Sequence, residues 1–111
     1  MGRYITTTGT AGATFREIST NYNALVNDRI LATTAAGALT ITLPASGSLL
    51  VNDTIQIIDI GATAATNNIT VARNGAKIQN VADDLTIDTN GAIVTLIYSG
   101  ATYGWIVGSA E

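Results

Sequence analysis

Residues 38–75 constrain the fold of this chain more than any other stretch. They contain three short runs, LTITL, TIQIIDI and NITVA, each bounded by turn-forming residues. Pro44 stands directly after the first run, where its missing N–H ends a strand. Asn74-Gly75 follows the third run and is typical of a tight hairpin turn, because both central positions of such a turn need a positive φ. The pattern predicts β-strands joined by short turns.

The second of these runs, residues 54–60, is apolar on both faces of a strand. Ile55 and Ile57 would share one face, while Ile58 and Ile60 would share the other. Two interpretations fit this pattern. Either the strand is central and covered on both faces, or a bulge at Ile57-Ile58 switches the faces.

Further strands are expected after residue 75. The Asn74-Gly75 turn predicts that residues 76–79 pair back onto residues 69–73. Residues 93–98 are predicted to form a closing hairpin with residues 105–107. The spacing favours about seven or eight strands in a compact antiparallel β-sandwich or jelly-roll-like barrel. Parallel pairing is not expected, since the loops are too short to hold a crossover helix.

The segment before residue 28 has a different pattern. Residues 1–13 are rich in Thr and Gly and predict an N-terminal arm. Thr14 and Glu17 match a helix capping box, in which each side chain satisfies a free backbone N–H. The apolar residues that follow at helical spacing are Phe15, Ile18, Tyr22 and Leu25. We therefore expect a short helix over residues 15–22, with residues 1–27 as arm and helix and residues 28–111 as the β-domain.

Composition excludes several classes of function. The chain has no His and no Cys, which removes the commonest general base, thiol nucleophile and metal ligands. Its 5 basic residues, 8 acidic residues and net charge of −3 argue against nucleic acid as a partner. No apolar run approaches the ~20 residues of a membrane span. We expect neither an enzyme nor a cofactor or metal site.

The acidic residues are the remaining candidates for chemistry. Asp53, Asp59, Asp83, Asp84 and Asp88 could supply a carboxylate pair or contribute to a calcium site. Asp53, Asp83 and Asp84 lie in turn-like sequence, however, where Asp bonds nearby backbone N–H groups. Asp59 lies within an apolar strand. It is either a buried partner of Arg29 or Arg73, or a solvent-facing side chain, and we favour solvent.

Tyr98, Tyr103 and Trp105 gather at the closing hairpin. Exposed aromatic clusters stack on sugars in many β-domains, so these residues are candidate contacts for a glycan. The alternative is that Trp105 fills the core and Tyr103 belongs to a turn.

The order of these runs over residues 28–107 resembles a small β-domain that recurs in bacteriophage virion proteins, including tail-fibre-like, appendage and capsid-associated proteins. The resemblance rests on TITLP, on the Asp-x-x-x-Ile-x-Asp strand, on ITVARNG and on the closing Tyr-x-Gly with its Trp. It implies a structural role, commonly as a trimer, with no catalytic motif. Members usually carry the domain within a long fibre chain, whereas here it is almost alone.

The resemblance therefore favours a homotrimeric capsid decoration or cement protein on the particle surface, bound to the major capsid protein or another virion protein. A tail-fibre or appendage subunit that binds host glycans is the alternative. In either case we expect the assembly interface to lie in the N-terminal part. Its candidate residues are Arg3, Tyr4, Ile5, Phe15, Ile18 and Tyr22.

Overall fold

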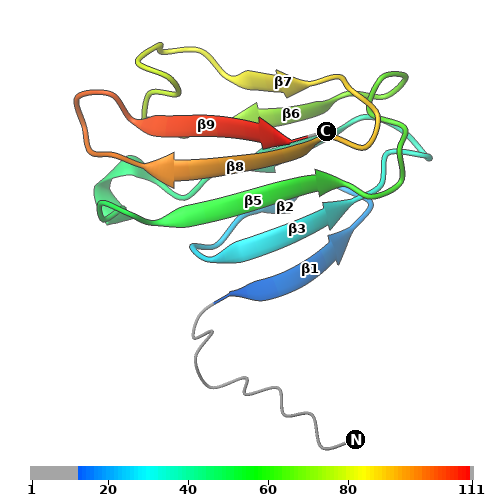
Figure 1. The fold of residues 1–111 in the computed structure, drawn as a ribbon, viewed down its shortest axis with the longest axis horizontal. Helices are drawn as coiled ribbons and strands as arrows, with labels where there is room; N and C mark the ends of the chain where they lie inside the picture. Colours follow the sequence, from blue (N-terminus) through cyan, green and yellow to red (C-terminus); the bar gives the residue numbers. More distant parts are fainter. Residues whose placement is uncertain (1–12, 111) are drawn as a thin grey trace, which may run out of the picture.

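The computed structural model describes residues 13–110, which form nine strands in two sheets (Figure 1). The five-stranded sheet contains, in spatial order, β1 (Thr14–Ile18), β3 (Asp28–Ala32), β5 (Thr54–Asp59), β8 (Ile93–Tyr98) and β9 (Trp105–Ala110). The four-stranded sheet contains β2 (Tyr22–Asn23), β4 (Leu39–Thr42), β6 (Ile69–Ala72) and β7 (Leu85–Ile87). One 3-10 turn, η1 (Ser46–Ser48), links β4 to β5. The all-β prediction is confirmed, and no described helix is long and apolar enough to cross a membrane.

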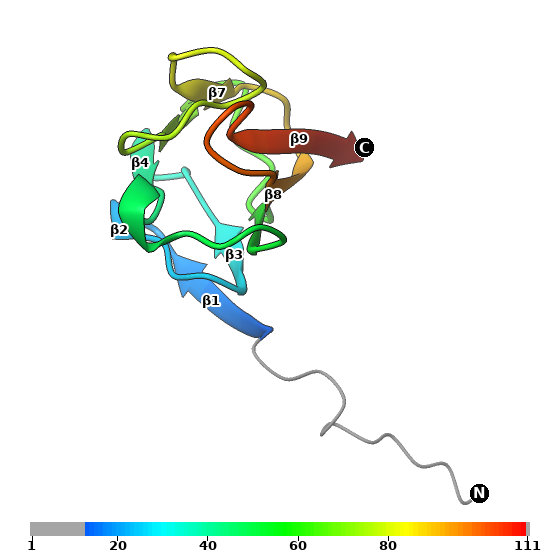
Figure 2. The ribbon, with the colours of Figure 1, turned by 90° about the vertical axis from the view of Figure 1, so that its left-hand side faces the viewer.

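The chain alternates between the two sheets from β1 to β6, so it winds as a coil around the core (Figure 2). As a result β1, β3 and β5 are parallel neighbours in one sheet, and β2, β4 and β6 are parallel neighbours in the other. Our exclusion of parallel pairing was wrong. A strand of the opposite sheet makes each crossover, and no helix is needed. The antiparallel pairs among the described strands are β5 with β8 and β8 with β9 in one sheet, and β6 with β7 in the other.

Inward side chains of both sheets form one hydrophobic cluster. Strand β5 alternates regularly, with Ile55 and Ile57 fully buried and Ile58 half-buried on the other side. Its register to β3 and β8 is continuous, so there is no bulge at Ile57-Ile58. The fully buried side chains contributed by several strands are Ile30, Ile41, Ile55, Ile57, Ile69, Val71, Leu96 and Trp105.

The predicted helix over residues 15–22 is wrong, because this segment forms strands β1 and β2. The five residues of β1 pair in register with β3, and the Asn21 Oδ1 accepts a hydrogen bond from the Thr40 N–H at 2.8 Å. A helix of two turns is marginal on its own in water, whereas the edge of a formed sheet satisfies the same backbone groups. Ser19, Thr20 and Asn21 are also poor helix formers. The sheets therefore begin before residue 28.

The Asn74-Gly75 turn is present, but its predicted hairpin partner is wrong. Asn74 and Gly75 have φ values of 51° and 99°, as the turn requires. Strand β6 nevertheless pairs with β7, and residues 76–79 pass to the edge of β9. The reason is burial, because Ala76 and Ile78 enter the core. The closing hairpin of β8 with β9 is confirmed.

Candidate functional site

The outward face of the five-stranded sheet, shown toward the viewer in Figure 1, is the candidate interaction surface. Strand register places its side chains in rows across the strands. One row begins with Glu17 and continues with the apolar residues Leu31, Ile58 and Ile93. A second row, called the polar row below, begins with Phe15 and continues with Arg29, Gln56 and Thr95. A third row joins Thr54, Ile97 and Ile106.

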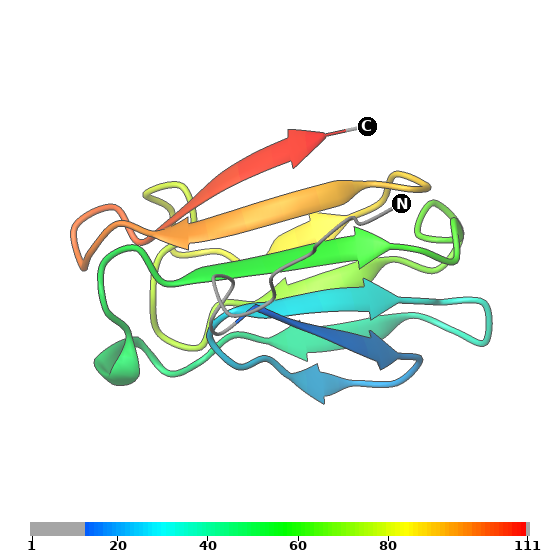
Figure 3. The same ribbon diagram turned by 60° about the horizontal axis from the view of Figure 1, so that its bottom comes forward.

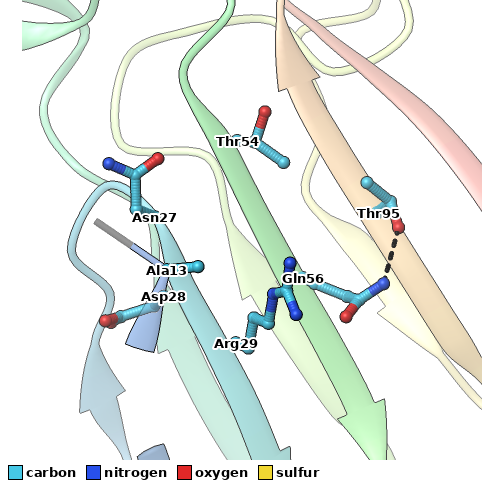
Figure 4. A pocket seen from close by; sticks show the side chains of 7 residues that line it. All are labelled: Ala13, Asn27, Asp28, Arg29, Thr54, Gln56 and Thr95. Carbon is cyan, nitrogen blue, oxygen red and sulfur yellow. Dashed lines mark hydrogen bonds between the residues drawn. The ribbon is translucent and has the colours of Figure 1, made fainter. Parts of the chain in front are cut away.

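The polar row lies in a shallow hollow of about 330 Å³ (Figure 4). Within it, the Gln56 amide donates a hydrogen bond from Nε2 to the Thr95 Oγ1 at 3.2 Å. The Arg29 side chain lies beside Gln56, and its guanidinium carbon is 5.9 Å from the centre of the Phe15 ring. The hollow is therefore lined by neutral hydrogen-bonding groups, by the Arg29 cation and by Asp28, whose Oδ2 already accepts hydrogen bonds from Tyr22 and Leu25.

A second hollow of about 450 Å³ lies at the far end of β1. Ile18, Leu31 and Ile60 supply its apolar wall, and Glu17 supplies an acid. Ile60 is 61% exposed although it continues the apolar pattern of β5. Among residues 13–110, the chain itself covers one face of β5 only.

Strand β1 also presents an open edge (Figure 3), because β3 is its only neighbour among the described strands. The Thr14 N–H donates to the Asn27 carbonyl oxygen, and the Thr33 N–H donates to the Ile18 carbonyl oxygen. Alternate residues of a parallel strand face the same neighbour, so Phe15 and Glu17 direct their N–H and C=O groups to the open edge. Such an edge is a site for pairing with another chain.

The predicted assembly residues are partly brought together here. Phe15 is 60% exposed on the outward face. Ile18 and Tyr22 are half-buried and pack against the start of the core. Arg3, Tyr4 and Ile5 lie outside the described residues.

Tyr22 and Asp28 tie the first strands together. The Tyr22 hydroxyl donates to the Asp28 Oδ2 at 2.7 Å, and the Leu25 N–H donates to the same oxygen at 2.8 Å. Arg16 Nε lies 3.8 Å from the other carboxylate oxygen, and Asp28 is only 3% exposed. Burial, together with the hydrogen bond to Asp28, raises the pKa of Tyr22 above its ordinary value of 10.0.

Replacing Tyr22 by phenylalanine is expected to cost about 1–2 kcal/mol at neutral pH, because a hydrogen bond to a buried carboxylate is lost. The raised pKa means that this contribution is fully present below pH 10.0 and is lost as pH rises through the pKa of folded Tyr22. Urea unfolding should therefore show that the free energy of unfolding differs between wild type and variant at neutral pH, and that this difference becomes smaller above pH 10.0. Tyr103→Phe, at an exposed tyrosine, is the control, and a difference independent of pH would contradict the assignment.

The three aromatic candidates for glycan contact do not form one exposed cluster. Trp105 is fully buried and Tyr98 is 7% exposed, and their rings meet edge to face with centroids 5.5 Å apart. Tyr103 alone is exposed, at 58%, beside Gln79 and Asn80. Trp105 therefore has the core position that we gave as the alternative.

Our preference for a solvent-facing Asp59 was wrong. The alternative was right that Asp59 is buried, but its hydrogen-bond donors are backbone N–H groups and not an arginine. Asp59 is 2% exposed, and its Oδ2 accepts the N–H groups of Ala64 and Gly91, each at 3.0 Å. The regular alternation of β5 turns residue 59 inward, and two loops supply backbone donors there. The carboxylate therefore organises turns at the end of the sheet.

The other acids also serve turns or remain at the surface. The Asp53 Oδ2 accepts the Leu50 N–H and the Asp84 Oδ1 accepts the Arg73 N–H. Within residues 13–110, no three His, Cys, Asp or Glu side chains gather closely enough to hold a metal ion.

Searches against models of protein families and against curated proteins give no match. Glu17 and Arg29, the charged groups of the outward face, were not among the predicted interface residues. The signal that could have found this face was the apolar pattern on both sides of residues 54–60.

Proposed function

We propose that this chain is a non-enzymatic bacteriophage virion structural protein, which assembles as a homotrimer and decorates the capsid surface. The resemblance over residues 28–107 supports the virion role. The structure supports assembly, because residues 13–110 present an open sheet face and an open strand edge and only shallow hollows. Capsid lattices contain local threefold sites, which a trimer matches by symmetry.

The exposed and half-buried apolar residues of the outward face carry this proposal. An antiparallel or mixed sheet with one face in water normally presents polar side chains there. Here isoleucines of β5 and β8 and an aromatic residue of β1 take those positions. The row of Leu31, Ile58 and Ile93 is contiguous across three strands, and contiguous apolar patches mark interaction sites. The residues are Phe15, Leu31, Ile58, Ile60, Ile93, Ile97 and Ile106.

We also propose that the architecture is a sandwich-like variant in which coiled parallel strands precede an antiparallel end. One hydrophobic cluster joins both sheets, which supports the sandwich over an open barrel. Assembly is favoured over glycan binding because Tyr98 and Trp105, which the glycan hypothesis needs at the surface, belong to that cluster.

The test measures oligomeric state and particle binding separately. At micromolar concentration, light scattering after gel filtration should give three times the chain mass. The purified chain should also co-sediment with phage particles stripped of it, whereas a monomer that fails to bind particles would contradict the proposal. Trimers that do not co-sediment with particles would contradict the decoration role but would still support assembly as a trimer.

A further inference from the structure

We infer that the outward face of the five-stranded sheet docks onto a second copy of this chain, with Glu17 of one copy paired to Arg29 of the next. The inference rests on the proposed function, since it names the surface and the partner through which the assembly forms.

Strands β5 and β8 carry apolar side chains on their outward face as well as on their inward face. Residues 54–60 have the composition of a strand covered on both faces, yet the described chain covers only the inward one. Strand β8 repeats the pattern, since Ile93 and Ile97 point outward while Val94 and Leu96 are buried. Two neighbouring central strands therefore lack the same cover. A second copy would offer the same apolar residues as cover.

The outward face carries one acidic and one basic side chain in its three rows. Glu17 and Arg29 are the charged side chains in the three rows of the outward face, and both are exposed. They stand on neighbouring strands in adjacent rows, which are about 7 Å apart along the strand direction. Among the described residues neither has an ion-pair partner, and the ion pair that does form joins Arg16 to Asp28. One acid and one base on an otherwise neutral face make that face complementary to itself.

The neutral groups that follow Arg29 across the sheet, on β5 and β8, also suit a second copy. Thr54, Gln56 and Thr95 are half-buried and neutral, so they can exchange hydrogen bonds with the same groups of another copy without burying a charge. A basic or acidic partner of another kind would leave either Glu17 or Arg29 facing a like charge, which disfavours association. The face therefore fits its own copy better than a charged surface.

The experiment reverses each charge alone and then both together. Glu17→Arg and Arg29→Glu should each raise the concentration at half-assembly by about tenfold or more, because like charges then meet across every contact. The double variant, E17R with R29E, should restore assembly to near the wild-type value. Gel filtration with light scattering reads out mass, and circular dichroism verifies that each exposed substitution leaves the fold intact.

Asp88→Arg is the matched control, since Asp88 is exposed and follows β7 of the other sheet. It changes net charge by the same amount as Glu17→Arg and should leave assembly unchanged. Equal weakening by all three single variants, or a double variant no better than the single ones, would overturn the inference. A trimer that survives both single reversals would overturn it too, while the proposed function stands.

Mixing the two single variants adds a test of symmetry. In a pair of unlike copies, opposite charges face each other in both contacts, because E17R meets R29E in one and the unchanged Glu17 meets the unchanged Arg29 in the other. A twofold assembly would therefore recover fully. In a ring of three, two kinds of copy cannot alternate, and one like-charge contact remains. We expect no full recovery on mixing. Recovery as a dimer would support the docking surface and reject the trimer, and a monomeric wild type would reject both.

Discussion

Replacing Asp59 by alanine is expected to lower the free energy of unfolding by about 3 kcal/mol, because two backbone donors lose their acceptor. The Oδ2 of Asp59 holds the N–H of Ala64, which is fully buried, and the N–H of Gly91. These donors come from the loops on either side of the sheet end, residues 60–68 and 88–92. Removing a buried charge relieves part of its desolvation, so the loss is smaller than two hydrogen bonds to a carboxylate would suggest.

The matched variant is Asp59→Asn. Its amide oxygen can take the position of Oδ2, and its NH2 group falls where Oδ1 has no hydrogen-bond partner among the described residues. We expect the free energy of unfolding of this variant to lie within about 1 kcal/mol of the wild-type value. Urea denaturation midpoints at constant m-value measure both changes. Equal losses for the two variants would show that the charge, rather than the accepted hydrogen bonds, stabilises the loops.

Replacing Gly104 by alanine is expected to cost about 3 kcal/mol or more, since the residue combines a positive φ with a close backbone neighbour. Gly104 has a φ of 75°, and an added Cβ would clash with the carbonyl group of Lys77. That carbonyl accepts the Trp105 N–H at 2.8 Å, so residues 77–79 would have to move off the edge of β9. Thermal unfolding and the near-ultraviolet signal of Trp105 measure the outcome.

Gly91→Ala is the control for backbone conformation alone. Gly91 has the same φ of 75° but open space where a Cβ would be placed. It should cost about 1 kcal/mol, the usual penalty for a left-handed L-residue. The difference between the two variants isolates the contact with Lys77. Equal costs would show that the close approach relaxes without loss.

Strands with local patterns were predictable from sequence. The alternation of residues 39–43, the stop at Pro44 and the hairpin of residues 93–107 all depend on neighbours in the chain. The switch between sheets was not predictable in this way. Nothing in the composition of β3 or β4 indicates that their partners lie in different sheets, because each has the same inward alternation.

The candidate site was predictable only in part. Phe15 was predicted at an interface because it would lie on the apolar face of a helix. It lies instead on strand β1 and is exposed on the outward face of the sheet. Glu17 was assigned to a capping box, and its register beside Leu31 follows from a parallel pair between residues 14 apart in the chain. Asp59 was misplaced because its acceptor role depends on donors from two distant loops.

The coiled path of the chain also determines the order in which the fold can form during synthesis. Among the described strands β1 is synthesised before its neighbour β3, which follows only after β2 has crossed to the other sheet. Neither sheet can therefore grow from a local hairpin at its N-terminal end. The nearest antiparallel pairs, β6 with β7 and β8 with β9, both lie in the last part of the chain. Loop closure between distant parallel strands is slow, so we expect folding to depend on the formation of the C-terminal antiparallel pairs.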